Sequence, residues 1–391
     1  HSHLLIMVIT IMSFKIVLVA NTAWSMFNFR HGVLTRLLRD GYQLTVIAPR
    51  DDFSDKLRSL GCTVIDLNMS AKGVNPIEDI KLIDALYRHY RTIKPNFIIH
   101  YTIKPNIYGS IAARLACIPS LAITTGLGYT FVNDNLVSKI ARCLYKIAFR
   151  FPKAIWFLNE DDRSEFVNRG LVSEHKTMVL HGEGVDTKYF SPRPNPNDDG
   201  KIRFLLIARM LWDKGVREYV EAARHIKAKY PNTVFQLLGA CGVANPSNIG
   251  QEQINEWVNE GIVEYLGTAQ DVRPIIAQAD CVVLPSYREG IPRTMIEAAA
   301  MAKPIVVSNA PGCRDVVLHG ETGLMCQVKD AQSLISSLEE LINMDVEKRA
   351  AMGNKARQWM ISSFDESIVI EKYLKMLFEF NSADKKPIKV D

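Results

Sequence analysis

Short runs of consecutive apolar residues alternate along the chain with stretches in which apolar residues recur every three or four positions. Unbroken apolar runs are typical of strands covered on both faces of a parallel sheet, and the helical stretches supply the crossovers that parallel strands need. The first half predicts strands at 15–20, 44–48, 63–67, 96–101 and 120–124, with helices at 27–38, 54–60, 80–92 and 107–116. The second half predicts strands at 203–208, 233–238, 263–266, 280–285 and 304–308, with helices at 216–229, 293–301, 331–342, 346–362 and 367–378. The predicted fold class is α/β, with two doubly wound, Rossmann-like parallel sheets.

The two halves are joined by residues 191–200, which are rich in Pro, Asn and Asp and contain no large apolar side chain. Such a composition is typical of a linker, and 391 residues suit two domains of ordinary size. We therefore expect domains at 1–190 and 201–365, with a helix in 366–391 that packs back on the first domain. In doubly wound sheets ligands bind at the carboxyl ends of the strands, so the chemistry is sought there.

Composition narrows the class of function. The net charge of +5 is too small to indicate a nucleic-acid binder, but it fits contact with an anionic membrane or with phosphorylated ligands. The seven cysteines are scattered, without a C-x-x-C pair or a Cys/His cluster. This favours a reducing compartment and predicts neither a disulfide framework nor a metal site.

The amino-terminal residues carry little structural signal. His1-Ser2-His3 is atypical of a natural start, and we expect one at Met7 or Met12, because a strand follows directly. The apolar run 4–12 is too short to span a bilayer, and it lacks the basic flank of a signal peptide. We expect a cytoplasmic protein that does not span the membrane.

The strongest chemical signal is the sequence LPSYREGIPRTMIEAAA at 284–300, which reads as a strand end, a loop and a helix. A helix that begins near Pro292 would direct the amides of its first turn toward a diphosphate. Glu289 and Glu297 are eight positions apart, a rise of about 12 Å in a helix, so they do not form the close carboxylate pair of a retaining glycosidase. We expect Glu289 to accept hydrogen bonds from a sugar and Glu297 from a ribose.

A second signal follows the strand at 203–208. Arg209 and Lys214 come just after its carboxyl end, where two cations near a helix amino end can hold a diphosphate leaving group. Gly239 marks another close turn after the strand at 233–238.

Three motifs together resemble glycosyltransferase family 4: R-x4-K-G after a strand, Gly184-Val185-Asp186 with Phe190 beyond it, and E-x7-E. That resemblance implies a retaining, metal-independent enzyme with the two-domain GT-B fold. In the first half, the segments 101–109 (YTIKPNIYG) and 124–131 (TTGLGYTF) are similar to bacterial enzymes that extend undecaprenyl-diphosphate oligosaccharides, above all N-acetylgalactosaminyltransferases.

The resemblance implies a role for each matching residue. A UDP-sugar donor would be held without cofactor or metal by Arg209, Lys214, Glu289 and Glu297, by the loop residues Gly290, Ile291, Pro292, Arg293 and Thr294, and by Gly239. A polyprenyl-diphosphate-linked saccharide would face Asn21, Thr22, Thr125 and Gly126. Lys104 is either a contact to the acceptor phosphate or a plain loop lysine. The sequence departs from many members in having Asn21-Thr22-Ala23-Trp24 in place of a glycine pair, and Thr124-Thr125 where a histidine is frequent.

The segment 136–153 predicts a basic amphipathic helix. Lys139, Arg142, Lys146 and Arg150 recur at spacings of three and four among apolar residues, a pattern that fits an anionic lipid surface. The same pattern also fits a helix that covers a sheet and turns its charges to solvent.

Other functions are weighed against transfer. A dehydrogenase would require G-x-G-x-x-G after a first strand, and neither 20–25 nor 208–215 supplies it. A sugar-nucleotide epimerase, and a non-catalytic protein that binds a nucleotide sugar or lipid, both remain open. His100 and His181 are expected to be structural histidines.

Overall fold

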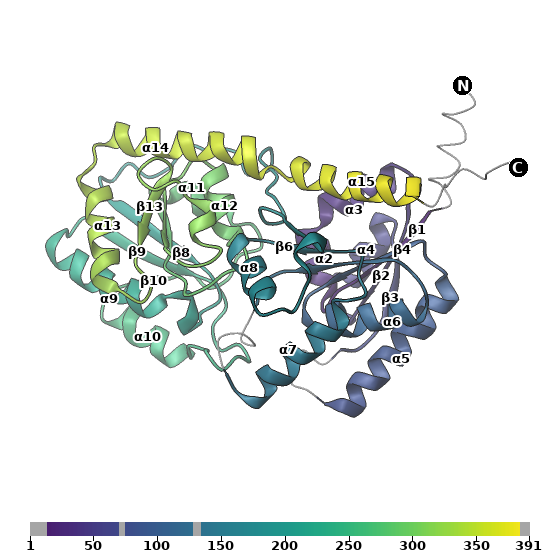
Figure 1. The fold of residues 1–391 in the computed structure, drawn as a ribbon. Coiled ribbons are helices and arrows are strands. Elements are labelled where there is room, and N and C mark those ends of the chain that lie inside the picture. Colours follow the sequence, from purple (N-terminus) through teal and green to yellow (C-terminus); the bar gives the residue numbers. More distant parts are fainter. Residues whose placement is uncertain (1–13, 70–74, 128–133, 384–391) are drawn as a thin grey trace, which may run out of the picture. The chain divides into compact units, whose positions relative to one another are not determined.

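The computed structural model describes residues 14–69, 75–127 and 134–383 of the chain. It divides them into two compact units, one reaching to Glu183 and resuming at Ile370, the other comprising Gly184–Val369 (Figure 1). The expected natural start and the apolar run 4–12 lie outside the described residues, as does the end of the segment 124–131.

The first unit is built on a seven-stranded sheet in the order β3-β2-β1-β4-β5-β6-β7. Every strand pairs in parallel with its neighbour. The strands are β1 (Lys15–Val19), β2 (Gln43–Ala48), β3 (Thr63–Asp66), β4 (Phe97–Tyr101), β5 (Ser120–Thr124), β6 (Ala154–Phe157) and β7 (Thr177–Val179). The helices are α2 (Ala23–Phe29), α3 (His31–Arg39), α4 (Ser54–Leu60), α5 (Pro76–Ile93), α6 (Ser110–Leu115), α7 (Leu136–Ala148) and α8 (Glu160–Asn168), with the short turns η1 (Pro105–Gly109) and η3 (Glu174–Lys176). The strand order reverses between β1 and β4, which is where such sheets leave a crevice for a ligand.

The second unit repeats the plan with six parallel strands in the order β10-β9-β8-β11-β12-β13. The strands are β8 (Ile202–Ile207), β9 (Thr233–Leu238), β10 (Glu264–Tyr265), β11 (Cys281–Leu284), β12 (Ile305–Ser308) and β13 (Gly323–Cys326). The helices are α9 (Val216–Lys229), α10 (Gln251–Asn259), α11 (Arg273–Gln278), α12 (Arg293–Ala300), α13 (Ala331–Asn343) and α14 (Val346–Trp359), with the turns η4 (Trp212–Lys214), η5 (Arg314–Val316) and η6 (Met360–Phe364). The predicted α/β class with two parallel sheets is therefore confirmed.

The apolar runs are explained by burial on both faces of the sheet. Along β8, Leu205 and Ile207 belong to one hydrophobic cluster, whereas Phe204 and Leu206 belong to another on the opposite face. The buried residues at the end of β8 therefore face two cores alternately, which explains why the run is apolar without interruption after Arg203.

The final helix, α15 (Glu366–Ala383), starts in the second unit, and from Ile370 onward it belongs to the first. There the Tyr373 hydroxyl lies 2.8 Å from the Tyr101 hydroxyl, and the Phe380 ring packs on Phe97 with 4.8 Å between ring centroids. Aromatic burial thus attaches the carboxyl-terminal helix to β4.

The helix predicted at 27–38 is two helices, α2 and α3, which meet at Arg30. The Arg30 backbone leaves helical geometry (φ −117°, ψ 15°), and its side chain is only 3% exposed. The guanidinium pairs with Glu183 and stacks 4.2 Å over the Tyr101 ring. The helix breaks here so that the charged Arg30 side chain can be buried. The spacing of apolar residues does not reveal such a break, so the pattern predicted one helix.

The helix predicted at 107–116 also has an unexpected start. It begins as the π-helical turn η1, and only then continues as α6. π-Helical turns are rare and are frequent at functional sites. The pattern further missed several short elements, namely β6, β7, β13, α8, α10 and α11.

His100, which the sequence predicted to be a structural histidine, lies near the carboxyl end of β4. It is fully buried on β4, its Nε2 atom lies 2.8 Å from the Tyr90 hydroxyl, and burial lowers its pKa to about 3. Gly109 of η1 packs directly on the ring, since a Cβ atom at this position would lie 2.2 Å from His100 Cδ2.

This contact predicts that Gly109→Ala destabilises the protein although alanine favours helix. The added methyl must displace a buried, hydrogen-bonded ring, and overpacking of this kind costs about 1–3 kcal/mol of unfolding free energy. Denaturant unfolding measures the loss. Gly250→Ala is the control, because its Cβ meets open space and its φ is ordinary. Equal stability of the two variants would contradict the close contact.

Candidate active site

Two of the motifs meet at one edge of the second sheet. Strands β8 and β11 are parallel neighbours, so the loops after them leave from the same edge. The Tyr287 amide, in the loop after β11, donates to the Asp213 carbonyl of η4 over 2.9 Å. The Lys214-Gly215 pair and the glutamate loop are thus one local structure.

Lys214 and Glu289 form an ion pair at this junction. The Lys214 ammonium lies 2.6 Å from Glu289 Oε1, and the two side chains are 20% and 13% exposed. The hydroxyl of Ser286, which is fully buried, donates to the same carboxylate oxygen over 2.8 Å. Two donors from different loops therefore fix the orientation of the carboxylate.

Glycines allow the loops to approach this closely. Gly215 has φ 76°, and a Cβ atom there would lie 2.0 Å from the Pro285 carbonyl oxygen. Gly239 has φ 152°, and its Cβ would lie 1.7 Å from the Ala208 carbonyl oxygen. Both positions exclude any other residue, which gives the K-G pattern a physical meaning.

Helix α12 presents its amino end at the same edge. Its first residue follows Pro292, and no side chain of the described residues caps it. The Thr294 hydroxyl donates to the Ile207 carbonyl, at the end of β8, over 3.1 Å. The positive end of the helix dipole therefore lies beside the last residue of β8, as an anion site requires.

Glu297 is buried within α12, with 8% of its surface exposed. Burial raises its pKa to about 7, and the opposing effect of Arg293, whose Nε lies 3.9 Å from Glu297 Oε1, is smaller. This carboxyl group changes its charge near neutral pH, and hydroxyl donors from a ligand would favour its ionised form.

The two cations predicted to hold the diphosphate, Arg209 and Lys214, have different surroundings in the structure. Arg209 is exposed, and among the described residues its guanidinium makes no hydrogen bond or ion pair. Lys214, expected beside it as part of the diphosphate clamp, is instead paired with Glu289.

Sequence reasoning missed two supporting residues. Ser286 holds Glu289, and the Tyr287 hydroxyl donates over 2.7 Å to Glu218, which is 7% exposed on α9. The position of Ser286 three residues before Glu289 was a usable signal. No sequence pattern could have predicted the contact between Tyr287 and Glu218, which are 69 positions apart.

The predicted acceptor residues lie in the first unit, at the ends of β1 and β5. Thr22 accepts from the Ser25 amide over 3.0 Å and so caps α2, while Asn21 is half-buried before it. Thr125 and Gly126 are half-buried after β5, and Gly126 has φ 135°.

Lys104 follows β4 and is not a free cation. Its ammonium lies 3.4 Å from Asp79 Oδ1, and the two side chains are 13% and 7% exposed. The Tyr108 hydroxyl donates to the other oxygen of Asp79 over 2.7 Å, and burial together with this contact raises the pKa of Tyr108. The charge of Lys104 is thus offset within the protein.

Helix α7 buries one face and exposes another that is both apolar and basic. Ser138, Ala141, Tyr145 and Ala148 are buried, whereas Leu136 (72%) and Ile147 (43%) are exposed. Lys139 and Lys146 are exposed as well, while Arg142 is 15% exposed and pairs with Asp134. The helix ends at Ala148 and not at 153 as predicted, so the exposed Arg150 lies beyond it. The described helices include none that is both long and apolar enough to cross a membrane.

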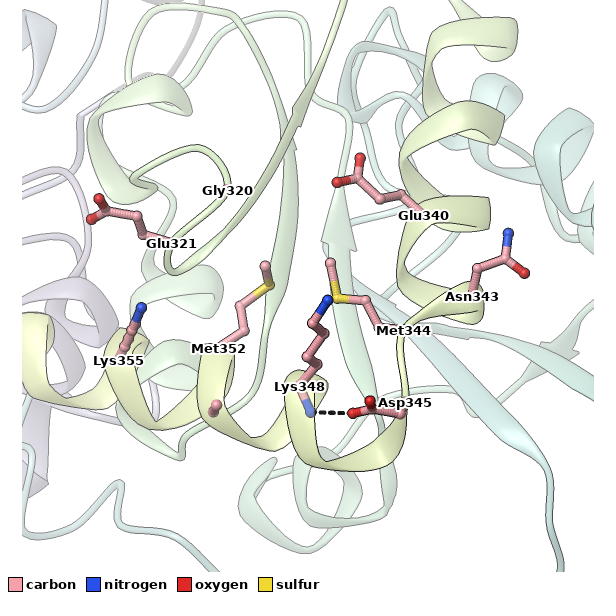
Figure 2. A pocket seen from close by; sticks show the side chains of 10 residues that line it. Gly320, Glu321, Glu340, Asn343, Met344, Asp345, Lys348, Met352 and Lys355 are labelled. Atoms are coloured by element: carbon pink, nitrogen blue, oxygen red, sulfur yellow. Dashed lines mark hydrogen bonds between the residues drawn. The ribbon is translucent and has the colours of Figure 1, made fainter.

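A hollow of about 740 Å³ lies elsewhere on the second unit (Figure 2). It is lined by Gly320, Glu321, Glu340, Asn343, Met344, Asp345, Lys348, Ala351, Met352 and Lys355. None of the predicted site residues borders it, and its charged side chains are of both signs. No group of three or more His, Cys, Asp or Glu among the residues described here is arranged to hold a metal ion.

Comparison with known proteins decides the family. Residues 15–159 match the family model "Glycosyl transferase 4-like", and residues 188–359 match "Glycosyl transferases group 1". The chain is 33% identical, over 90% of its length and 95% of the relative's, to the N,N'-diacetylbacillosaminyl-diphospho-undecaprenol alpha-1,3-N-acetylgalactosaminyltransferase of Campylobacter jejuni. The chain belongs to the glycosyltransferases.

Other relatives agree with this assignment. The glycosyltransferase is 25% identical, over 68% of its length and 71% of the relative's, to the UDP-Gal:alpha-D-GlcNAc-diphosphoundecaprenol alpha-1,3-galactosyltransferase of Escherichia coli. Among solved structures, Anabaena HepE in complex with UDP and glucose superimposes with a TM-score of 0.77 at 19% identity, over 93% of this chain and 99% of HepE. The family resemblance and the GT-B fold are both confirmed.

Because the Glu297 carboxyl is buried, we expect it to make the stability of the protein depend on pH. Its folded pKa of about 7 lies above the ordinary 4.5, so the folded state holds a proton that the unfolded state releases. The glycosyltransferase should therefore lose up to roughly 3 kcal/mol of unfolding free energy as the pH rises from about 4.5 to about 7. Glu297→Gln should remove that part of the slope.

Denaturant unfolding at a series of pH values measures the difference. Glu321→Gln, at an exposed position, serves as control and should keep the wild-type slope. Parallel curves for Glu297→Gln and wild type would refute the raised pKa.

Proposed function

We propose that this glycosyltransferase moves a sugar from a UDP-sugar to a membrane-linked polyprenyl-diphosphate saccharide in bacterial surface glycan assembly. An N-acetylhexosamine such as GalNAc is the proposed donor sugar. The names of the Campylobacter and Escherichia coli relatives support the acceptor, because each describes a sugar carried on diphospho-undecaprenol or diphosphoundecaprenol. The name of the first supports the donor sugar.

The observation that carries the proposal is the Lys214–Glu289 pair beside the amino end of α12. A nucleotide sugar can replace each side chain as the partner of the other. Its diphosphate attracts the Lys214 ammonium, and its hydroxyls donate to the Glu289 carboxylate. Until a donor binds, the pair keeps both charges compensated. Arg209, which is exposed, supplies a second cation for the diphosphate.

We assign the reaction stereochemical retention without a metal ion. The bond from the sugar C1 to the diphosphate oxygen breaks, the oxygen of the acceptor hydroxyl bonds to C1 on the same face, and the leaving phosphate takes the proton of that hydroxyl. Such a reaction requires stabilisation of a departing diphosphate, which Lys214, Arg209 and the α12 dipole offer. Glu297, buried beyond them in α12, would hold the ribose.

The membrane is the proposed location of the acceptor, and α7 is the proposed contact. Its exposed Leu136, Ile140 and Ile147 accompany exposed Lys139 and Lys146, so apolar and cationic groups reach the same solvent. Apolar side chains between lysines bind anionic lipid through burial and charge together. The enzyme would work at the inner face of the cytoplasmic membrane.

The transfer reaction is tested by nucleotide release from a panel of UDP- and GDP-sugars, with and without a polyprenyl-diphosphate saccharide. Wild type should release one nucleotide, and only with the lipid acceptor. Glu289→Ala and Lys214→Ala should lower kcat by about 10²–10³-fold, because they remove stabilisation of the leaving group and its orientation. Lys355→Ala, at an exposed lysine that borders the hollow in Figure 2, should retain the wild-type rate.

Two outcomes would redirect the assignment. Interconversion of the sugar without acceptor would indicate an epimerase. Tight donor binding with no release for any pair would indicate a binding protein.

Membrane contact predicts that Leu136→Asp combined with Ile140→Asp abolishes binding to vesicles containing anionic lipid, measured by flotation. The aspartates replace apolar groups and repel the surface. Val346→Asp is the control, because Val346 is equally exposed (71% against 72% for Leu136) but lies on α14 of the second unit. Retained binding of the double variant would contradict the role of α7.

A further inference from the structure

The segment from the end of β4 to the start of α6 in the first unit contains an unusual group of polar atoms without partners. Among the described residues, His100 Nδ1, Thr102 Oγ1, Asn106 Oδ1 and Ser110 Oγ are all buried without a hydrogen-bond partner. They fall within residues 100–110, which also contain the π-helical turn η1. Buried polar groups are normally satisfied, so a cluster of exceptions requires a cause.

The backbone at Thr102 is strained as well. Its φ is +69°, a left-handed conformation that a β-branched residue adopts only at a cost in stability. The Asn106 amide donates to the Thr102 carbonyl over 2.9 Å, so the two residues are one helical turn apart. Strain and unsatisfied atoms thus coincide at one turn, which makes it a functional candidate rather than an incidental defect.

The position of this turn agrees with a ligand site. It leaves the carboxyl end of β4, which pairs with β1, at the point where the strand order of the sheet reverses. Asn21 and Thr22 follow β1 at the same edge. Both loops therefore leave from the edge at which sheets of this kind bind their ligands.

The chemistry of Asn106 identifies the kind of ligand. Its Nδ2 donates to the Ile123 carbonyl over 2.9 Å, which fixes the amide, because a flipped amide would set two oxygens against each other. Oδ1 is therefore a fixed acceptor, and Asn106 is only 1% exposed. An acceptor oxygen repels phosphate and matches a hydroxyl, and the Thr102 hydroxyl adds a group that either donates or accepts.

We propose that Thr102 and Asn106 recognise hydroxyl groups on the saccharide of the acceptor, after a rearrangement of the turn that releases its strain. This inference rests on the proposed function and assigns the sugar, not the diphosphate, to the end of β4. The compensation of Lys104 by Asp79 agrees with it, since an ammonium neutralised within the protein is a poor diphosphate clamp.

The test measures binding by calorimetry, with farnesyl diphosphate that carries an N-acetylhexosamine and with farnesyl diphosphate alone. Thr102→Gly removes the hydroxyl and relieves the strain. It should raise the melting temperature and weaken binding of the sugar-bearing probe about tenfold, the loss expected for about one hydrogen bond. Binding of farnesyl diphosphate alone and of the nucleotide sugar should not change.

Two variants separate recognition from stability. Cys117→Gly removes comparable strain, since Cys117 has φ +59° in an exposed turn of the same unit, and it should gain stability with unchanged binding. Thr102→Ser keeps the hydroxyl and should bind the sugar-bearing probe as wild type does.

The outcomes distinguish the two proposals. Equal affinity of Thr102→Gly and Cys117→Gly for the sugar-bearing probe, or an equal loss with farnesyl diphosphate alone, would overturn the assignment of Thr102. Absence of sugar binding by wild type would overturn it too. Weaker sugar binding in Thr102→Gly, in a protein that transfers no sugar, would leave this inference standing and reject the transfer reaction.

Discussion

The donor half of the site depends on one backbone contact, the approach of Gly215 to the Pro285 carbonyl. Any Cβ at position 215 would lie 2.0 Å from that oxygen, so the loops after β8 and β11 meet only because the residue is glycine. The Asp213–Tyr287 hydrogen bond and the Lys214–Glu289 pair both form across this junction, and the Ser286 hydroxyl also lies 3.2 Å from the Asp213 carbonyl oxygen. Without it, a lysine and a glutamate 75 positions apart would be two ordinary surface charges.

This dependence explains how much of the site the sequence could predict. The short motifs encode their own loops, and parallel neighbouring strands bring such loops to one edge, so Lys214, Glu289 and the start of α12 were accessible from the sequence. The partner of each charge was not, because distances of a few ångström depend on packing between segments. Lys214 was expected to hold the diphosphate together with Arg209, and the structure pairs it with the Glu289 carboxylate.

In the fold too, features that depend on a local pattern were predicted, and features that depend on contacts between distant segments were not. Apolar runs predicted both sheets, because burial on two faces leaves a simple pattern in the chain. The break at Arg30 was missed, because its cause is a glutamate 153 positions away. The left-handed Thr102 and the π-helical turn were missed for a related reason: neither is favoured by its local sequence, and the surrounding packing has to impose them.

The loops after β11 and after β4 differ in how well their polar groups are satisfied before a ligand binds. The difference follows from what each loop would bind. After β11, the Glu289 carboxylate has two donors in place, and the neighbouring loop is fastened by backbone contacts. Such a preordered site loses little conformational entropy when a ligand replaces one hydrogen-bond partner by another. After β4, an acceptor oxygen and a hydroxyl are buried on a strained turn and have no partner within the described part of the chain. There the ligand would supply what the protein lacks, so part of its binding energy would go into rearranging the turn. A site of this kind discriminates well, because a molecule without the matching hydroxyls leaves the strain and the unsatisfied atoms as they were.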